Sequence, residues 1–390
     1  LINFGNGITT AGAILISQYL GAREDEQANS MANHICLTSL AFSVLCALIC
    51  WIVSPGLVKW LGAEGSIYKY GLTYIRIVVL DLPFLFTINL FTSVRQSQGD
   101  TVKPMLLNMF GVVINLILDP LFLMVFKWGI GGAALATLIA KIPCAVIALI
   151  VLTRPEQLIR IDFIGFQFDK SKMGSIVKIG LPTAIGGSTM QLGFLLMTKN
   201  VNAYGFIATS AYGIGNKINS IITMPANGIG SAISTIVGQN VGAGQKDRAD
   251  KAYHYALRMG AMFLLFFGLI LSRRFISQAM VTFFSTDERV IPLATDFLSL
   301  MAFWCWSNAF YNVTQGLFQG SGHTKYSMAM EVGRLWGMRL PMILLFKTFT
   351  DIGSLGVWIS MTSSNFLICV FAFLMYRYGK WQQPALHHKK

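Results

Sequence analysis

The sequence has little charge for its length. Only 12% of its 390 residues are Asp, Glu, Lys or Arg, whereas 54% are hydrophobic and the mean hydropathy is +0.59. A water-soluble chain carries about a quarter charged residues, so this chain lacks the polar surface that would coat a soluble core. The net charge of +13 does not indicate a nucleic-acid protein, because the basic residues are scattered singly instead of forming a patch. We therefore expect a membrane protein.

The chain also lacks clustered metal ligands and catalytic side chains. It has no Cys-x-x-Cys motif, and its six cysteines lie within apolar stretches, where small packing residues are expected. Its five histidines lie near the expected loop ends or in the C-terminal tail. We expect no disulfide, no metal cluster, no cofactor and no enzyme activity.

Apolar runs long enough to cross a bilayer fill most of the chain. A helix that crosses the hydrocarbon core needs roughly 20 mainly apolar residues. We expect an all-α polytopic membrane protein, with a lobe over 1–152, a polar linker over 153–172, a lobe over 173–378 and a tail over 379–390. One partial span is expected over residues 1–20. Ten complete spans are expected near residues 31–53, 66–92, 102–126, 130–152, 173–203, 207–241, 249–271, 291–319, 326–346 and 352–376.

The basic residues between these spans are distributed unequally. If the loop after the partial span is cytoplasmic, that side of the membrane holds sixteen Lys and Arg residues and the other side holds eight. Cytoplasmic loops carry an excess of Lys and Arg. This asymmetry predicts a cytoplasmic C-terminus.

The two parts of the chain resemble each other. SQYLGAREDEQA (17–28) resembles GQNVGAGQKDRA (238–249) at an offset of 221 residues, and RQSQGDT (95–101) resembles FQGSGHT (318–324) at an offset of 223. Six spans fit one repeat, and an even number of crossings returns the chain to its starting side. We therefore expect two pseudo-symmetric six-helix lobes, related as parallel repeats about an axis along the membrane normal.

The repeat also predicts what precedes the chain. Leu1 corresponds to about residue 222 of the second repeat, which begins near residue 172. The first helix and half of the second are then missing, so the first lobe holds helices 2–6. We expect the chain without them to be inactive.

Several motifs resemble the repeated signatures of MATE (multidrug and toxic compound extrusion) transporters, over Leu1 to about Tyr376. The resemblance implies a central cavity and ion-coupled multidrug efflux, in which lipophilic or cationic compounds leave in exchange for H⁺ or Na⁺. It also implies a bacterial inner-membrane protein, which we expect to be a monomer. The motifs are GQNVGAGQKDRADKA (238–252), SQYLGAREDEQA (17–28), QSQGDTVKPM (96–105), NLILDPLF (115–122) and GIGGAALAT (129–137).

Asp119 is the most informative ionisable residue within a span, where such residues mark function by default. Asn115 precedes it by one helical turn, on the same face. Pro120 follows and cannot donate to the carbonyl of Leu116. These oxygen ligands suit Na⁺ or a proton, but a structural Asp119 held by Lys141 is an equally open interpretation.

The resemblance bears on that choice. In one branch of the family, an Asn and an Asp on the fifth helix join a Thr on the sixth, and these match Asn115, Asp119 and Thr137. Another branch uses carboxylates on the seventh and tenth helices, where this sequence has Gln191 and Asn308. The resemblance therefore implies that Asp119 is the cation-coupling residue. Gln191 and Asn308 are candidate residues of a substrate cavity.

Glu331 and Arg334 lie three residues apart in the span over 326–346, and this spacing predicts a local ion pair. Arg334 and Arg339 also leave a second function open. A flippase for lipid-linked saccharides, from the same wider superfamily, is expected to have a more cationic cavity.

Overall fold

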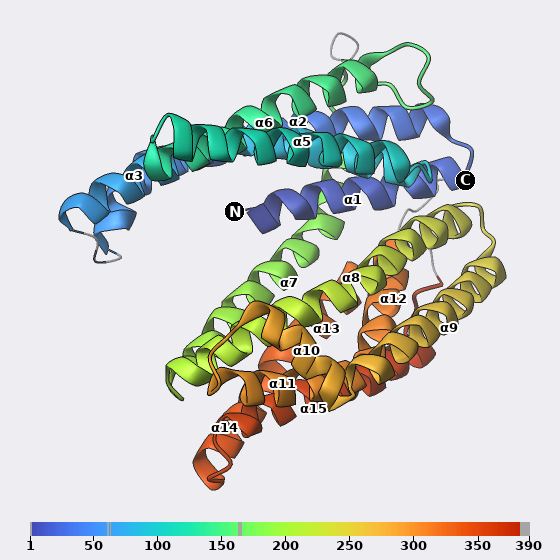
Figure 1. Cartoon of the computed structure of the whole chain (residues 1–390). Coiled ribbons are helices and arrows are strands. Elements are labelled where there is room, and N and C mark those ends of the chain that lie inside the picture. Colours follow the sequence, from blue (N-terminus) through green and yellow to red (C-terminus); the bar gives the residue numbers. More distant parts are fainter. Residues whose placement is uncertain (1, 61, 63, 163–165, 383–390) are drawn as a thin grey trace. The chain divides into compact units, whose positions relative to one another are not determined.

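The computed structural model describes residues 2–60, 62, 64–162 and 166–382, and these residues form helices and connecting loops with no β-strand (Figure 1). They divide into two compact units, Leu1–Ala184 and Ile185–Lys390. The expected all-α fold is confirmed. The first unit holds α1 (Ile2–Gly21), α2 (Asp25–Trp60), α3 (Gly65–Leu80), α4 (Leu82–Ser97), α5 (Val102–Pro120), the π-helix η1 (Leu121–Val125), α6 (Gly129–Thr153) and the start of α7 (Lys170–Asn202).

The second unit holds the rest of α7 and the helices that follow it. Its short helix α10 lies between 271 and 291, where the sequence predicts no span. The helices are α8 (Phe206–Gly242), α9 (Lys246–Leu271), α10 (Arg274–Phe284), α11 (Val290–Phe303), α12 (Trp306–Gly320), α13 (Thr324–Val332), the π-helix η2 (Gly333–Arg339), α14 (Leu340–Phe349) and α15 (Ser354–Tyr378).

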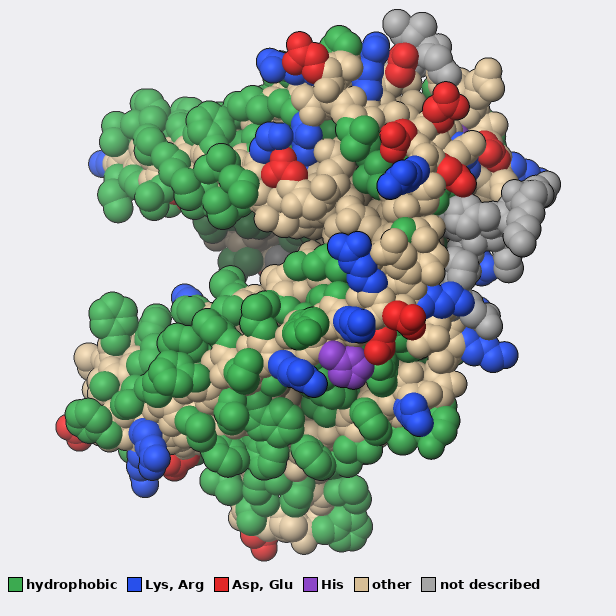
Figure 2. Space-filling model, turned by 90° about the vertical axis from the view of Figure 1, so that its right-hand side faces the viewer, with side chains coloured by type: hydrophobic (Ala, Val, Ile, Leu, Met, Phe, Trp, Pro, Cys, Tyr) green, Lys and Arg blue, Asp and Glu red, His purple; other side chains and the backbone are tan. Residues whose placement is uncertain are grey.

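Eight helical segments in the described chain are long and apolar enough to cross a membrane, or nine if α11 and α12, bent by 53°, form one span. The span expected over 326–346 corresponds to the continuous run of α13, η2 and α14. It is not one of these eight segments, and it contains the charged residues Glu331, Arg334 and Arg339. Large apolar side chains lie on the surface; Trp60 is 82% exposed. In Figure 2 hydrophobic side chains cover much of the left part of each unit. Soluble monomers rarely expose such surfaces, so these side chains face lipid.

The repeat reappears in the order and the breaks of the helices. α3 and α4 meet at Asp81, and α11 and α12 meet at Trp304, 223 residues later. In each repeat the next span contains a π-helix, η1 or η2. α1 packs against α2 and α4, and α8 packs against α9 and α12. Each half is thus built on the same internal plan, while the rotation expected to relate the halves stays a prediction.

The repeated glycines form turns. Gly99 and Gly322 follow α4 and α12 with φ of +84° and +81°, a backbone region that only glycine adopts at low cost. Asp100 then accepts hydrogen bonds from the backbone N–H groups of Val102 and Lys103, both at 3.2 Å. Slight burial raises the pKa of Asp100, but these bonds and the Lys103 ammonium outweigh it and hold the pKa below its usual range. Gly99 and Asp100 of the repeated motif therefore have a structural role, which is to form the turn after α4 and to begin α5.

The linker between α6 and α7 is attached to the start of α2. The first compact unit continues into α7 as far as Ala184, and the boundary between the lobes expected at residues 172 and 173 stays a prediction. The described linker residues contact α2 through backbone N–H groups that donate to three side chains: Arg160 to Asn29 at 2.7 Å, Asp162 to Asn33 at 2.9 Å and Asp169 to Nε2 of His34 at 2.8 Å. Linker residues 163–165 and tail residues 383–390 lie outside the described residues.

Close packing of α8 on α12 depends on glycine. A Cβ atom on Gly230 of α8 would lie 2.6 Å from the carbonyl oxygen of Asn312. A Cβ atom on Gly316 of α12 would lie 2.1 Å from the carbonyl oxygen of Gly230. Small residues let helix backbones approach in lipid, where packing replaces the hydrophobic effect as the main attraction between helices. This contact fixes the face that α12 presents to the interior of the unit.

Gly230→Ala is expected to destabilise the second unit by about 1–3 kcal/mol, because the added methyl group meets backbone that cannot rotate away. Gly228→Ala is the matched control, since a Cβ atom there meets nothing within 4 Å and alanine favours the helix. The thermal unfolding midpoint of each purified variant in detergent measures the effect. Equal midpoints for the two variants would contradict the packing argument.

Candidate functional sites

A cavity of about 200 Å³ lies between α4, α5 and α6 in the first unit. Asn115 of α5 and Thr137 of α6 line it, together with Asn89, Asn108 and Lys141. α5 and α6 run side by side, so residues on their facing surfaces meet (Figure 1). The structure therefore brings two of the three predicted ion-site residues to one cavity.

Asp119 lies one helical turn from Asn115 on α5, but it is not among the residues that line this cavity. It is half-buried, and its Oδ1 is buried without a hydrogen-bond partner in the described part of the chain. Nδ2 of Asn115 is in the same state, while the Thr137 hydroxyl donates to the carbonyl oxygen of Ala133 at 3.2 Å. The π-helix η1 begins directly after Pro120. π-Helical segments within longer helices are frequent at functional sites.

Lys141 binds the carboxylate of Asp81 and not that of Asp119. Its ammonium donates to Oδ2 of Asp81, a side chain that is buried at the break between α3 and α4. The interpretation in which Lys141 holds Asp119 is therefore wrong. No local pattern in the sequence predicts this pair, because Asp81 and Lys141 lie sixty residues apart in the chain.

Lys141→Met is expected to destabilise the first unit, because it leaves the Asp81 carboxylate buried without its cation. Loss of one partner of a buried ion pair costs about 3–5 kcal/mol, and the partial exposure of Lys141 places the expected loss at the lower end. The double variant Asp81→Leu with Lys141→Met removes both charges and should regain most of the loss. The thermal unfolding midpoints of Lys141→Met, Asp81→Leu and the double variant give the coupling free energy between the two side chains. Additive losses would contradict the pair.

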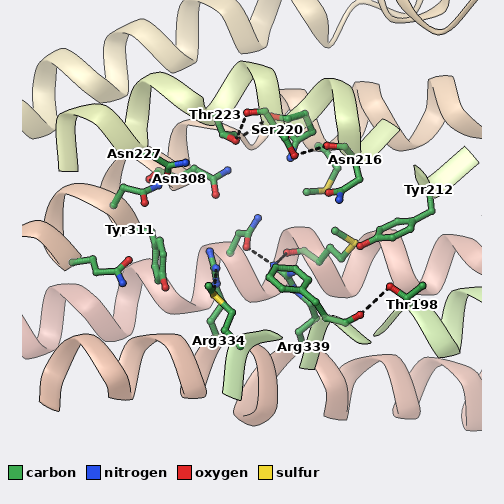
Figure 3. Close-up of a pocket in the computed structure, with 18 residues that line it drawn as sticks. Thr198, Tyr212, Asn216, Ser220, Thr223, Asn227, Asn308, Tyr311, Arg334 and Arg339 are labelled. Atoms are coloured by element: carbon green, nitrogen blue, oxygen red, sulfur yellow. Dashed lines mark hydrogen bonds between the residues drawn. The ribbon is translucent and has the colours of Figure 1, made fainter. Parts of the chain in front are cut away.

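The second unit contains a larger cavity of about 520 Å³ (Figure 3). One wall is a face of α8, where polar residues recur every three or four positions, as a single helix face requires. Side chains of α12 and η2 form other parts of the wall, as Figure 3 shows for Asn308, Tyr311, Arg334 and Arg339. The polar lining residues of α8 are Asn216, Asn219, Ser220, Thr223 and Asn227.

Both arginines of this cavity contact neutral groups. The Arg334 guanidinium lies 3.9 Å from the ring centroid of Tyr311, and its Nη2 is 3.6 Å from the sulfur of Met190. Arg339 is 3% exposed; its Nε donates to the Ser364 hydroxyl at 2.9 Å and its Nη2 to Oδ1 of Asn365 at 2.6 Å. Neither arginine forms an ion pair with a carboxylate in the described chain.

Glu331 and Arg334 are not in ion-pair contact in the described chain, so the contact expected from their spacing is wrong, although the guanidinium still acts electrostatically on the carboxylate. The carboxylate accepts a hydrogen bond from the Gln315 amide, and Arg334 lies on Tyr311 instead. η2 begins at Gly333, and its wider turn removes the three-residue alignment that an α-helix provides. Oε2 of Glu331 is buried without a hydrogen-bond partner among the described residues. Gly186 of α7 leaves room for it, since a Cβ atom there would lie 2.1 Å from this oxygen.

Of the two residues predicted for a substrate cavity, Asn308 lines the larger cavity. Gln191 is exposed and is not part of the lining, because Met190, Phe194 and Thr198 are the residues of α7 that face inward. The polar row on α8 is not among the residues predicted from the sequence. Its signal was present, since Asn216, Ser220 and Asn227 recur at helical spacing within an apolar span.

The MatE family model matches residues 1–121 and 182–345. The "Probable multidrug resistance protein YoeA" of Bacillus subtilis is 25% identical over 399 residues, which cover 99% of this chain and 84% of that protein. The "Multidrug export protein MepA" of Staphylococcus aureus is 21% identical and covers 96% of this chain and 82% of its own length.

Solved structures are similar to this chain over nearly its whole length. The crystal structure of MATE in complex with MaL6 has a TM-score of 0.91 at 22% identity, covering 96% of this chain and 84% of that one. An outward-facing multidrug resistance MATE family transporter of the MOP superfamily has a TM-score of 0.90 at 22% identity, with the same coverage. At these identities the likeness establishes the fold.

Proposed function

Because the chain belongs to the MatE family, we propose that it is a secondary active multidrug efflux antiporter that exports small organic molecules in exchange for H⁺ or Na⁺. Relatives named as multidrug resistance and export proteins support the substrate class. The observation that carries the proposal is the cavity of about 520 Å³ within the second helical unit, a size that suits a drug-sized ligand. No chemical reaction is assigned to the protein.

We propose that the coupling ion binds in the first unit, at Asp119 with Asn115 and Thr137. A gradient drives transport only if the ion binds differently in the two alternating states. Asp119 suits this role because its Oδ1 is buried without a partner, next to a π-helical break in α5. Asn115 and Thr137 supply further oxygen ligands from the adjoining cavity. The same oxygens accept a proton or coordinate Na⁺.

Two substrate classes fit different parts of the second cavity. Lipophilic compounds fit the side chains of Met190, Phe194 and Met361, which pack adaptably around apolar groups. Organic cations are the class implied by the sequence resemblance, but Arg334 and Arg339 provide no electrostatic attraction for them. These arginines favour the second candidate, a flippase for lipid-linked saccharides.

The proposed location is the bacterial inner membrane, with a cytoplasmic C-terminus and a monomeric protein. The bacterial sources of the relatives support the membrane. The excess of Lys and Arg in the loops on one side supports the orientation.

Asp119→Asn is expected to abolish gradient-driven efflux, because the amide keeps the shape of the side chain but removes the titratable charge. The assay measures export of a fluorescent dye by the complete protein in vesicles under an imposed pH or Na⁺ gradient. Asp296→Asn is the control, since that carboxylate is partly exposed and paired with Arg274 at 3.2 Å. Normal efflux by Asp119→Asn would place the coupling site elsewhere, and Glu331 would be tested next.

A further inference from the structure

The charge of the second cavity is positive. Arg334 and Arg339 are the charged side chains among its lining residues, and neither Asp nor Glu lines it in the described part of the chain. Glu331 is not one of the lining residues; one of its oxygens accepts a hydrogen bond from Gln315, which does line the cavity, and Oε2 lies against Gly186. A positive field in a space with little water acts strongly on a ligand, because the low dielectric screens it weakly.

Arg334 has donors to spare. Its Nε is buried without a hydrogen-bond partner among the described residues, and its Nη2 faces only the weak sulfur acceptor of Met190. The hydroxyl of Tyr311, which is 5% exposed and lies beneath the same guanidinium, is also buried without a partner there. An arginine fork and a phenol donor together match the oxygens of a phosphate or a carboxylate. Both residues line the cavity, where a rotation of their side chains would turn these unpaired donors toward a bound anion.

Arg339 is fixed in place by its neighbours. Ser364 and Asn365 of α15 accept its hydrogen bonds, and these partners leave its positive charge uncompensated. It lies five residues after Arg334 along η2, and both side chains reach the same cavity (Figure 3). The π-helical turn is what brings two arginines at this spacing to one surface.

Amides and hydroxyls form the opposite wall. Asn216, Ser220 and Asn227 of α8 face the arginines across the cavity in Figure 3, and Asn308 of α12 adds a further amide. Amides both donate and accept hydrogen bonds, so they match ligand hydroxyl groups in either direction. A lipophilic cation would desolvate these groups without replacing their hydrogen bonds, and it would lie beside two positive charges.

We propose that this cavity binds an organic anion: a compact phosphate or carboxylate at Arg334 and Tyr311, with a hydroxyl-rich body along the amides of α8. This proposal specifies the substrate class of the proposed function. It rests on that function in one respect, because it takes this cavity as the substrate site. Free sugar phosphates and lipid-linked ones share this chemistry.

The test is isothermal titration calorimetry of the purified protein in lipid nanodiscs with three probes. Glucose 1-phosphate represents the free ligand, its decyl ester the lipid-linked one, and tetraphenylphosphonium a lipophilic cation. At least one phosphate probe is expected to bind. Arg334→Gln should weaken that binding about ten-fold or more, as loss of a hydrogen bond to a charged group predicts, and Arg334→Lys should retain part of it.

Two further variants separate the anion site from general effects of charge. Arg258→Gln removes a positive charge from an exposed position on α9 and should leave the affinity unchanged. Glu331→Gln removes the nearby negative charge and should tighten phosphate binding. A thermal unfolding midpoint for each variant shows that it is folded. Arg334→Gln is chosen over a change at Arg339, whose hydrogen bonds tie η2 to α15.

Failure of both phosphate probes to bind would overturn the proposal. So would phosphate affinity that is the same in Arg334→Gln and Arg258→Gln, or tetraphenylphosphonium binding that is tighter than phosphate binding in the parent protein. Whichever phosphate probe binds identifies the source of the ligand. Loss of gradient-driven efflux tests the proposed function separately, since a protein that binds the phosphate but transports nothing contradicts antiport and leaves the anion site standing.

Discussion

Polar groups inside a bilayer are costly unless they find partners within the protein, and this cost shapes the whole chain. Backbone groups satisfy one another in helices, which is why the described spans are helical. Ionisable side chains survive only where a neighbour, a cavity or a ligand compensates them. Oδ2 of Asp81 has Lys141 and Oε1 of Glu331 has Gln315, while the other oxygen of each carboxylate is buried without a hydrogen-bond partner among the described residues. The side chains whose compensation is incomplete are the ones that indicate function.

The two repeats differ in which charged side chains they keep within the bilayer, where each such side chain needs compensation. The first unit presents a carboxylate at Asp119 with oxygen donors at Asn115 and Thr137, a set that suits a small cation. The second unit presents Arg334 and Arg339 with amides, a set that suits an anion. The sites that we propose in the two repeats thus differ in charge. Under this proposal one repeat would bind the driving ion while the other would bind the transported molecule.

Sequence alone predicted the spans well, because the length of an apolar run is a direct consequence of bilayer thickness. It also predicted the repeat, since the turns at Gly99 and Gly322 require the same residue type for the same backbone reason. Side-chain partners were predicted less well. The pairing of Glu331 with Arg334 assumed an α-helix, and the pairing of Lys141 with Asp119 ignored Asp81, which lies sixty residues from Lys141 in the chain. Long-range contacts and π-turns leave little trace in a local pattern.

The two π-helices connect these observations. η1 follows Asp119 and Pro120, and η2 contains Arg334 and Arg339, so the fifth helical segment of each repeat departs from α-helical geometry next to the charged side chains that we propose to be functional. A π-turn costs backbone hydrogen-bond quality, and a chain retains it where the altered direction of a side chain is useful. In η2 that altered direction places both arginines on one cavity and separates Arg334 from Glu331. A regular α-helix there would align Glu331 with Arg334, and the positive charge that we assign to ligand binding would be neutralised within the helix itself.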